Sequence, residues 1–197
     1  TAATTTAAQT SVMFMRVASI EIRKPRPEVG EPKNSATMAP ISARLALTLS
    51  AANMKGVALG RQLFHDTRLS VNQTQSCASC HDQTRAFADA RRFSLGAEQQ
   101  MGKRNAMPLF NLAWQPSFFW DGRAATLREQ VLMPIQDAHE MNETLPKVIA
   151  KLSADPECTQ AFEKAFGYAE ITAERVAKAL EQFLLTLVSQ ESRFDRA

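Results

Sequence analysis

The chain has 197 residues, of which 45% are hydrophobic and 22% are charged, a composition close to that of an ordinary soluble globular protein. Its formal net charge of +3 is small and spread along the sequence, which argues against a nucleic-acid-binding protein. No run approaches the roughly 20 apolar residues that a membrane span requires, and the seven glycines follow no period, which argues against a fibrous or repeat protein.

The first 50 residues differ from the rest of the chain. Residues 1–10 are low in complexity, and residues 22–35 are rich in proline and charge. Only residues 11–22 (SVMFMRVASIEI) are apolar enough for a short strand. We therefore predict an irregular or poorly ordered extension over residues 1–50 and one domain over residues 51–197.

The domain begins with a helical pattern and continues with a long irregular segment. In KGVALGRQLFHD (residues 55–66) the apolar residues recur at helical spacing, which predicts a helix. From there to about Pro116 the sequence is turn-prone and is interrupted by Gly96, Gly102 and Pro108. A loop of that length in a compact domain needs a core of its own, and a cofactor would supply one.

The last third of the chain is predicted to be helical, so the fold class is mostly α. A helix starts in AATLREQVLMPI (residues 124–135), and Pro134 should end or kink it. Asn142 is a candidate N-cap for the next helix. A third helix has Asp155 as its N-cap, Pro156 at its first position and Gly167 as its stop.

Residues 172–190 form the strongest of these predicted helices. Its apolar residues lie on one stripe, which indicates a face packed against the core. The stripe consists of Val176, Leu180, Phe183, Leu184 and Leu187.

The motif CASCH (residues 77–81) carries the chemistry. Two thiols three residues apart, Cys77 and Cys80, can add to the two vinyl groups of a protoporphyrin, and His81 then lies under the iron as an axial ligand. A zinc site would need a second ligand pair, yet His65 and His139 lie far apart in the sequence. A redox dithiol would need a βαβ context, which is absent. We therefore predict covalently bound haem c.

The motif alone does not decide whether the iron carries electrons or does chemistry. An electron carrier closes the sixth iron position, often with methionine. Four methionines are candidates by their distance along the chain: Met101, Met107, Met133 and Met141. The remaining cysteine, Cys158, is interpreted as a small buried hydrophobic residue.

Five motifs in order resemble one family, the bacterial dihaem cytochrome c peroxidases and their relative MauG. The motifs cover about residues 55–196 and read LGRQLFHDTRLS, SCASCHD, GKRNAMPLFNLAW, FFWDGRAATLREQ and HEMN. The resemblance is to the N-terminal, peroxidatic haem domain of that family. It implies a cytochrome c-like domain with long irregular loops wrapped around one covalently bound haem.

The resemblance also implies roles for individual residues. His81 would be the proximal ligand, and Gln130 and Glu140 would line the distal pocket. A carboxylate such as Glu140 can move a proton between the two oxygens of peroxide, and an amide such as Gln130 can hydrogen-bond the bound oxygen. Trp120 would lie between two haems as an electron relay, and Asn105 would lie near a calcium site.

Two departures from the family pattern refine these expectations. Ala97 occupies the position at which many of these peroxidases place a displaceable histidine, so we expect an open or water-bound iron, with Met101 as the competing sixth ligand. The sequence also holds a single CxxCH, so a second, electron-donating haem is not encoded in it. The chain is a fragment, has its second half on another polypeptide, or is a single-haem relative.

The predicted function is therefore a haem c peroxidase that reduces hydrogen peroxide, or the peroxidatic half of one, with MauG-like protein oxidation as a variant. The alternative is a monohaem c-type electron-transfer cytochrome. The expected partners are peroxide and a redox partner protein or a second haem domain. Because haem c is attached on the far side of the bacterial cytoplasmic membrane, a periplasmic or exported protein is expected.

Overall fold

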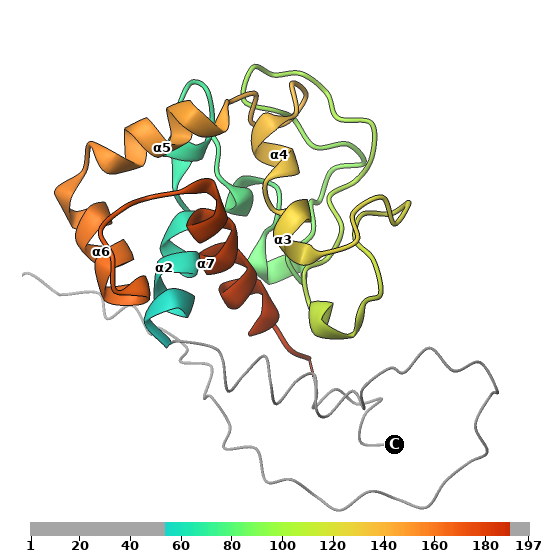
Figure 1. Cartoon of the computed structure of the whole chain (residues 1–197). Helices are drawn as coiled ribbons and strands as arrows, with labels where there is room; N and C mark the ends of the chain where they lie inside the picture. The colour runs from blue at the N-terminus through green and yellow to red at the C-terminus, as the bar shows by residue number, and fades with distance from the viewer. Residues whose placement is uncertain (1–53, 190–197) are drawn as a thin grey trace, which may run out of the picture. The chain divides into compact units, whose positions relative to one another are not determined.

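The computed structural model describes residues 54–189, coloured in Figure 1. The predicted extension and its candidate strand lie outside this range. Within it the regular structure is helical, as predicted, and the α-helices are α2 (Met54–Phe64), α3 (Leu127–Gln130), α4 (Met133–Gln136), α5 (Leu145–Ser153), α6 (Pro156–Phe166) and α7 (Ala173–Leu185). Four single 3₁₀ turns join them: η1 (Thr67–Leu69), η2 (Cys77–Ser79), η3 (Gln83–Arg85) and η4 (Leu112–Trp114).

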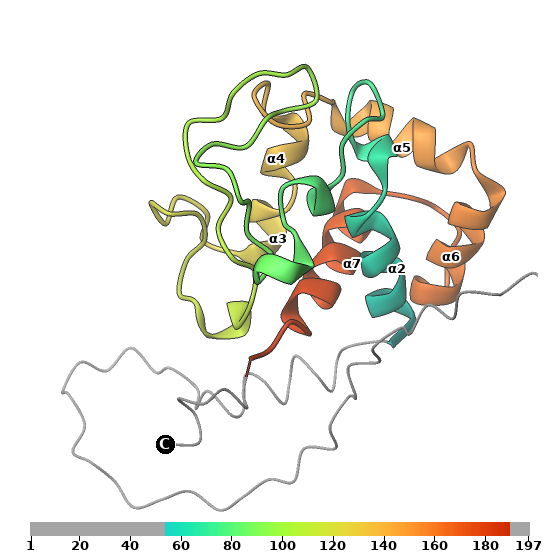
Figure 2. The ribbon, with the colours of Figure 1, turned by 180° about the vertical axis from the view of Figure 1, so that it is seen from behind.

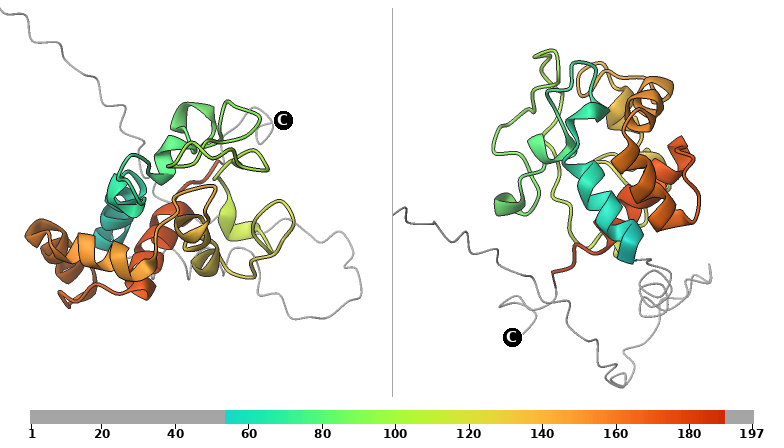
Figure 3. Two further views of the ribbon diagram at one scale, coloured as in Figure 1. Left: turned by 90° about the horizontal axis from the view of Figure 1, so that it is seen from above. Right: turned by 90° about the vertical axis from the view of Figure 1, so that its left-hand side faces the viewer.

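Helices α2 and α7 lie against each other at the centre of the described region. Figures 1 and 2 show α5 and α6 on one side of this pair, and the long loops with α3 and α4 on the other. The views in Figure 3 show the same separation. The predicted irregular segment is confirmed, because the chain between α2 and α3 forms only 3₁₀ turns and isolated bridges.

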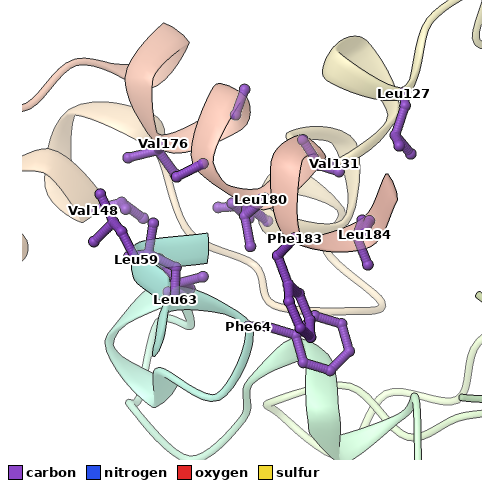
Figure 4. Packing of buried hydrophobic residues seen from close by; sticks show 14 of the residues in the cluster. Leu59, Leu63, Phe64, Leu127, Val131, Val148, Val176, Leu180, Phe183 and Leu184 are labelled. Carbon is purple, nitrogen blue, oxygen red and sulfur yellow. The ribbon is translucent and has the colours of Figure 1, made fainter. Parts of the chain in front are cut away.

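The close packing of α2 on α7 depends on a glycine. A Cβ atom built on Gly60 would lie 1.9 Å from the backbone oxygen of Ala179, so no larger residue fits without separating the helices. Figure 4 shows Phe64 of α2 beside Phe183 of α7, and their ring centroids are 5.3 Å apart. Gly60 therefore allows these two helices to form one apolar core.

The predicted stripe on α7 is largely confirmed. Val176, Leu180, Phe183 and Leu184 are buried, and Thr172 caps the helix by accepting a hydrogen bond from the Arg175 N–H. The last residue of the stripe, Leu187, lies beyond the end of the helix at Leu185, although it still packs against the core.

The helix boundaries in the middle of the C-terminal third differ from the prediction in two places. The expected single helix from residue 124 is two short helices, and the break comes before Pro134. Pro134 lies in the first turn of α4, where the backbone N–H that proline lacks has no helical partner anyway. The predicted N-cap at Asn142 is wrong, because Asn142 adopts a left-handed turn (φ +50°) and α5 begins after Thr144.

The ends of α6 are as predicted. The Asp155 side chain accepts a hydrogen bond from the Glu157 N–H at 2.9 Å, and Pro156 opens the helix. Gly167 ends it in the left-handed conformation (φ +82°) that glycine adopts most readily. Cys158 is buried in this helix, which fits its interpretation as a small hydrophobic residue.

A buried polar network fixes the segment that leads to CASCH. The Glu143 carboxylate, only 4% exposed, lies 2.6 Å from Lys151 Nζ, and the same ammonium donates to the Ser70 carbonyl at 2.7 Å. The Ser70 hydroxyl in turn accepts a hydrogen bond from the Gln75 N–H at 3.1 Å. Helix α5 therefore anchors the chain two residues before Cys77.

Candidate haem-binding site

One pocket brings together the residues that the sequence predicted for the site. They come from the CASCH turn, the end of helix α3 and the turn after α4: Cys77, Cys80, His81, Gln130 and Glu140. These five are the haem-attachment and distal residues predicted from the sequence, and residues as far apart in the chain as Cys77 and Glu140 thus meet at one site.

The CASCH residues share one face because η2 forms a single tight turn. The N–H groups of Cys80 and His81 both donate to the Cys77 carbonyl, at 3.2 and 3.0 Å. Neither cysteine is in a disulfide. Burial raises the pKa of the Cys77 thiol to about 12, so this group stays a neutral thiol at physiological pH.

The His81 ring is oriented by the backbone. Its Nδ1 lies 2.7 Å from the Phe87 carbonyl oxygen, to which it can only donate. The carbonyl faces the ring because Ala86 and Phe87 are both left-handed (φ +56° and +59°) and reverse the chain. With the proton on Nδ1, the lone pair on Nε2 is available to a metal. Burial lowers the pKa of His81, which favours this neutral form.

Gln130 and Glu140 lie on the α3–α4 side of the pocket. Gln130 is the last residue of α3 and is buried, and Glu140 is partly buried in the turn after α4. Burial raises the pKa of the Glu140 carboxyl, and the nearby charge of Asp137 adds to this effect. A carboxyl in such surroundings can exchange protons closer to neutral pH than an exposed one.

The other pocket walls are apolar, and the sequence patterns did not assign them to a site. Phe64, Leu180 and Leu184 come from α2 and α7, and Ile135 comes from α4. Their helical spacing predicted only that they are buried in the core. A buried residue that faces a pocket has the same spacing, so the pattern cannot distinguish the two. Pro134 also lines the pocket, although the sequence indicated it only as a helix breaker.

Trp120 and Asn105 lie outside this pocket, beside each other at the surface. The Trp120 side chain is 60% exposed, and its Nε1–H donates to the Asn105 carbonyl at 2.9 Å. The Asn105 side-chain N–H₂ donates to the carbonyls of Asp89 and Arg91, at 3.2 and 2.6 Å. Among residues 54–189, no three His, Cys, Asp or Glu side chains are grouped as a metal site.

The methionines that the sequence offers as sixth ligands differ in whether they line the pocket. Met101, the first choice from the sequence, is 60% exposed and is not part of the pocket wall. Met141, directly after Glu140, is buried and lines the pocket. Of the methionines within the described part of the chain, the geometry therefore favours Met141 as the residue able to approach a bound iron.

Ala97 is buried beside the pocket turn. Its N–H donates to the Glu140 carbonyl at 2.6 Å, so the loop that carries it lies directly against the residue predicted to be catalytic. Its short side chain adds no metal-binding group there.

The residues present fit a haem c. The pocket combines an apolar wall, two unpaired thiols spaced as CxxC and an imidazole whose Nε2 is left without a proton. Cys77 and Cys80 would hold the macrocycle covalently, and His81 would bind the iron.

Comparison with known proteins agrees with this assignment. Residues 54–197 match the family model described as di-haem cytochrome c peroxidase. The chain is 40% identical over 138 residues to the methylamine utilization protein MauG of Methylophilus methylotrophus, covering 70% of this chain and 41% of that protein. It is also 40% identical over 139 residues to the cytochrome c551 peroxidase of Pseudomonas aeruginosa, covering 70% of this chain and 40% of the relative.

Solved structures show the same relationship. The fold is similar to that of a MauG-like protein associated with microbial copper homeostasis, with a TM-score of 0.68 and 33% identity, covering 72% of this chain and 43% of the other. It also resembles the dihaem peroxidase BthA of Burkholderia thailandensis, with a TM-score of 0.63 and 29% identity over 71% of this chain and 41% of that one. The chain thus spans about two fifths of the length of these relatives. On the family match and the shared fold, the chain belongs to the di-haem cytochrome c peroxidase family.

Proposed function

We propose that this chain is the peroxide-reducing haem domain of a c-type cytochrome peroxidase. The observation that supports it most directly is the meeting of Glu140 and Gln130 with the CASCH cysteines and His81 in one largely apolar pocket. An electron carrier has no need of an acid–base group and an amide beside its iron. A proton-moving carboxyl with a raised pKa is what the cleavage of peroxide requires.

The overall reaction takes one hydrogen peroxide, two electrons and two protons to two waters. The haem, when bound, supplies the iron at which peroxide is reduced. His81 would bind the iron, and its ring is oriented by the hydrogen bond between Nδ1 and the Phe87 carbonyl. Gln130 orients peroxide by hydrogen bonding, and Glu140 takes a proton from one oxygen and returns it to the other, so that water leaves.

The electrons come from a redox partner protein or a second haem domain. Trp120 is the proposed entry point, and its large surface exposure makes it accessible to such a partner. MauG-like oxidation of a protein substrate is a variant of the same chemistry, supported by the likeness to MauG proteins.

Asn105 is the proposed calcium ligand. Both hydrogen bonds that fix the Asn105 side chain use its nitrogen, which leaves the amide oxygen for a hard cation such as calcium.

The proposed location is periplasmic or exported, because haem c is attached there. No helix within residues 54–189 is long and apolar enough to cross a bilayer.

The decisive test is Glu140→Gln, which keeps the size of the side chain and removes its acid–base function. The reaction of the ferric haem with peroxide, followed by stopped-flow absorbance, should slow by roughly 10²- to 10⁴-fold, the usual contribution of a general acid–base group. Haem attachment should be unchanged.

Glu163→Gln is the matched control, because Glu163 is exposed on α6, which contributes nothing to the pocket wall. It should react with peroxide at the normal rate. A Glu140→Gln protein that reacted equally fast would remove Glu140 from the mechanism.

One observation favours the second candidate, an electron-transfer cytochrome. Met141 lines the pocket, so its thioether could close the sixth iron position. In that case the ferric protein would show a low-spin His/Met spectrum that Met141→Leu abolishes. The peroxidase proposal expects an open or water-bound iron whose spectrum Met141→Leu leaves unchanged.

A further inference from the structure

Glu140 is held in place from outside the pocket by the loop of residues 94–102. A Cβ atom built on Gly96 would lie 2.2 Å from the His139 carbonyl oxygen and 2.8 Å from that of Glu140. The loop backbone therefore packs directly on the backbone of the Glu140 turn, at a separation that only glycine permits.

Backbone groups of Ala97 connect the turn that holds Glu140 to the segment that precedes CASCH. The Ala97 N–H donates to the Glu140 carbonyl at 2.6 Å, and the Ala97 carbonyl accepts a hydrogen bond from Asn72 Nδ2 at 2.5 Å. Asn72 lies five residues before Cys77. A continuous chain of hydrogen bonds thus runs from the haem-attachment segment through the loop to Glu140.

Further hydrogen bonds connect the segment before CASCH, the loop of residues 94–102 and the turn that holds Glu140. Gln75 Nε2 donates to the Leu95 carbonyl at 2.5 Å, and Asn142 Nδ2 donates to Glu98 Oε2 at 2.7 Å. The Val71 N–H donates to the Met141 carbonyl at 2.9 Å. These bonds restrain the backbone of Glu140 relative to CASCH.

We infer that Asn72 and Gly96 are positioning residues, which set the location of the Glu140 carboxyl in the pocket through the loop of residues 94–102. This inference rests on the proposed function, because it concerns the residue that moves the proton. Neither residue needs to touch peroxide. A displacement of the catalytic group by even 1 Å is enough to slow a reaction substantially.

Asn72→Asp is the sharpest test. The Asn72 Oδ1 accepts hydrogen bonds from the Thr74 N–H and hydroxyl, at 3.2 and 2.6 Å, and an aspartate keeps both. The aspartate loses only the N–H that binds Ala97 and places a negative charge against the Ala97 carbonyl. Gly96→Ala is the second variant, and it forces the loop away from residues 139 and 140.

Three measurements on the haem-loaded protein follow these variants. Hydrogen–deuterium exchange at the Ala97 amide should become about tenfold faster, as expected for the loss of roughly one hydrogen bond. The peroxide reaction should slow by about three- to tenfold. The acidic limb of its pH profile should move to lower pH, because a displaced Glu140 becomes better hydrated.

Asn111→Asp is the matched control. Asn111 Nδ2 also donates to a backbone carbonyl, that of Ser189 at 3.2 Å, and this bond joins η4 to the chain after α7 and not to the loop of residues 94–102. It should change none of the three measurements. A merely structural role for Asn72 would lower the thermal midpoint without moving the acidic limb.

The outcomes separate this inference from the proposed function. Normal exchange and a normal acidic limb in Asn72→Asp would overturn the inference, whether or not Gly96→Ala folds. A Glu140→Gln protein with full peroxide reactivity would instead overturn the proposed function, whatever the loop variants do.

Discussion

At the scale of single residues, the two sides of the pocket are tuned by different means. His81 is kept neutral by burial, and its ring is held by backbone carbonyls, with Nδ1 2.7 Å from that of Phe87. Glu140 is placed where burial disfavours its charge, although Arg123 and His139 offset part of that effect. One residue is thus prepared to bind a metal, and the other to exchange a proton.

The raised pKa of Glu140 predicts a pH dependence. Glu140 must be ionised to accept the first proton of peroxide, so the second-order rate should fall as the pH drops through its pKa. Because burial raises that pKa, the fall should begin above the usual range of about 4.3 for glutamate. Stopped-flow rates measured across the acidic to neutral range would locate the limb.

Glu140→Gln is the reference for this profile. Its residual rate should lack the limb, since the titrating group is gone. An unchanged limb in that variant would show that a group other than Glu140 causes it.

At the scale of elements, the α2–α7 contact supports one wall of the pocket. Phe64, Leu180 and Leu184 belong both to the core between these helices and to the pocket lining. Anything that separates the helices should therefore lower stability and disturb the haem site together.

Gly60→Ala tests this contact. The new methyl group would collide with the backbone of Ala179, which cannot rotate away, so the free energy of unfolding should fall by about 1–3 kcal/mol. Denaturant unfolding followed by circular dichroism measures it.

Gly56→Ala, one turn earlier on the same helix, is its control. There the new methyl group meets the end of the flexible Gln182 side chain, which can move aside. Alanine also favours the helix, so stability should stay level or rise by up to about 1 kcal/mol. Equal destabilisation by both variants would contradict the proposed role of the Ala179 contact.

At the scale of the whole molecule, the single CxxCH among these 197 residues predicts one covalent haem on them, and the proposed function takes its electrons from a redox partner protein or a second haem domain. Without a donor, peroxide consumption should stop after about one equivalent per haem, and a small-molecule reductant should restore it. Trp120→Phe should slow the donor-dependent phase and spare the first equivalent, because Trp120 lies at the surface and outside the pocket.

Tyr168→Phe, another exposed aromatic position, is the control for Trp120→Phe and should leave both phases unchanged. Haem content by absorbance and intact mass would confirm the stoichiometry. Equal slowing of both phases by Trp120→Phe would place the tryptophan in peroxide binding rather than in electron entry.

Much of the fold was predictable from local patterns. Apolar spacing located α2 and α7, and the Asp155, Pro156 and Gly167 signals marked the ends of α6, because these features depend on neighbours within one or two turns. The break before Pro134 and the start of α5 after Thr144 were missed. Both helices nevertheless have a local start signal, a proline in the first turn, which was read at Pro134 only as a helix breaker.

The sequence by itself determined the chemistry of the site: CASCH indicates a covalent haem, and the collinear motifs indicate the family and its distal glutamate and glutamine. The tertiary structure decided which residues meet. It places Glu140 and His81 in the wall of one pocket, places Met141 rather than Met101 in that wall, and shows the hydrogen bonds that join Asn72 and Glu140 to Ala97. The physical reason is that residue type and spacing specify what a side chain can do, whereas its neighbours depend on long-range packing and on backbone hydrogen bonds that any residue can make.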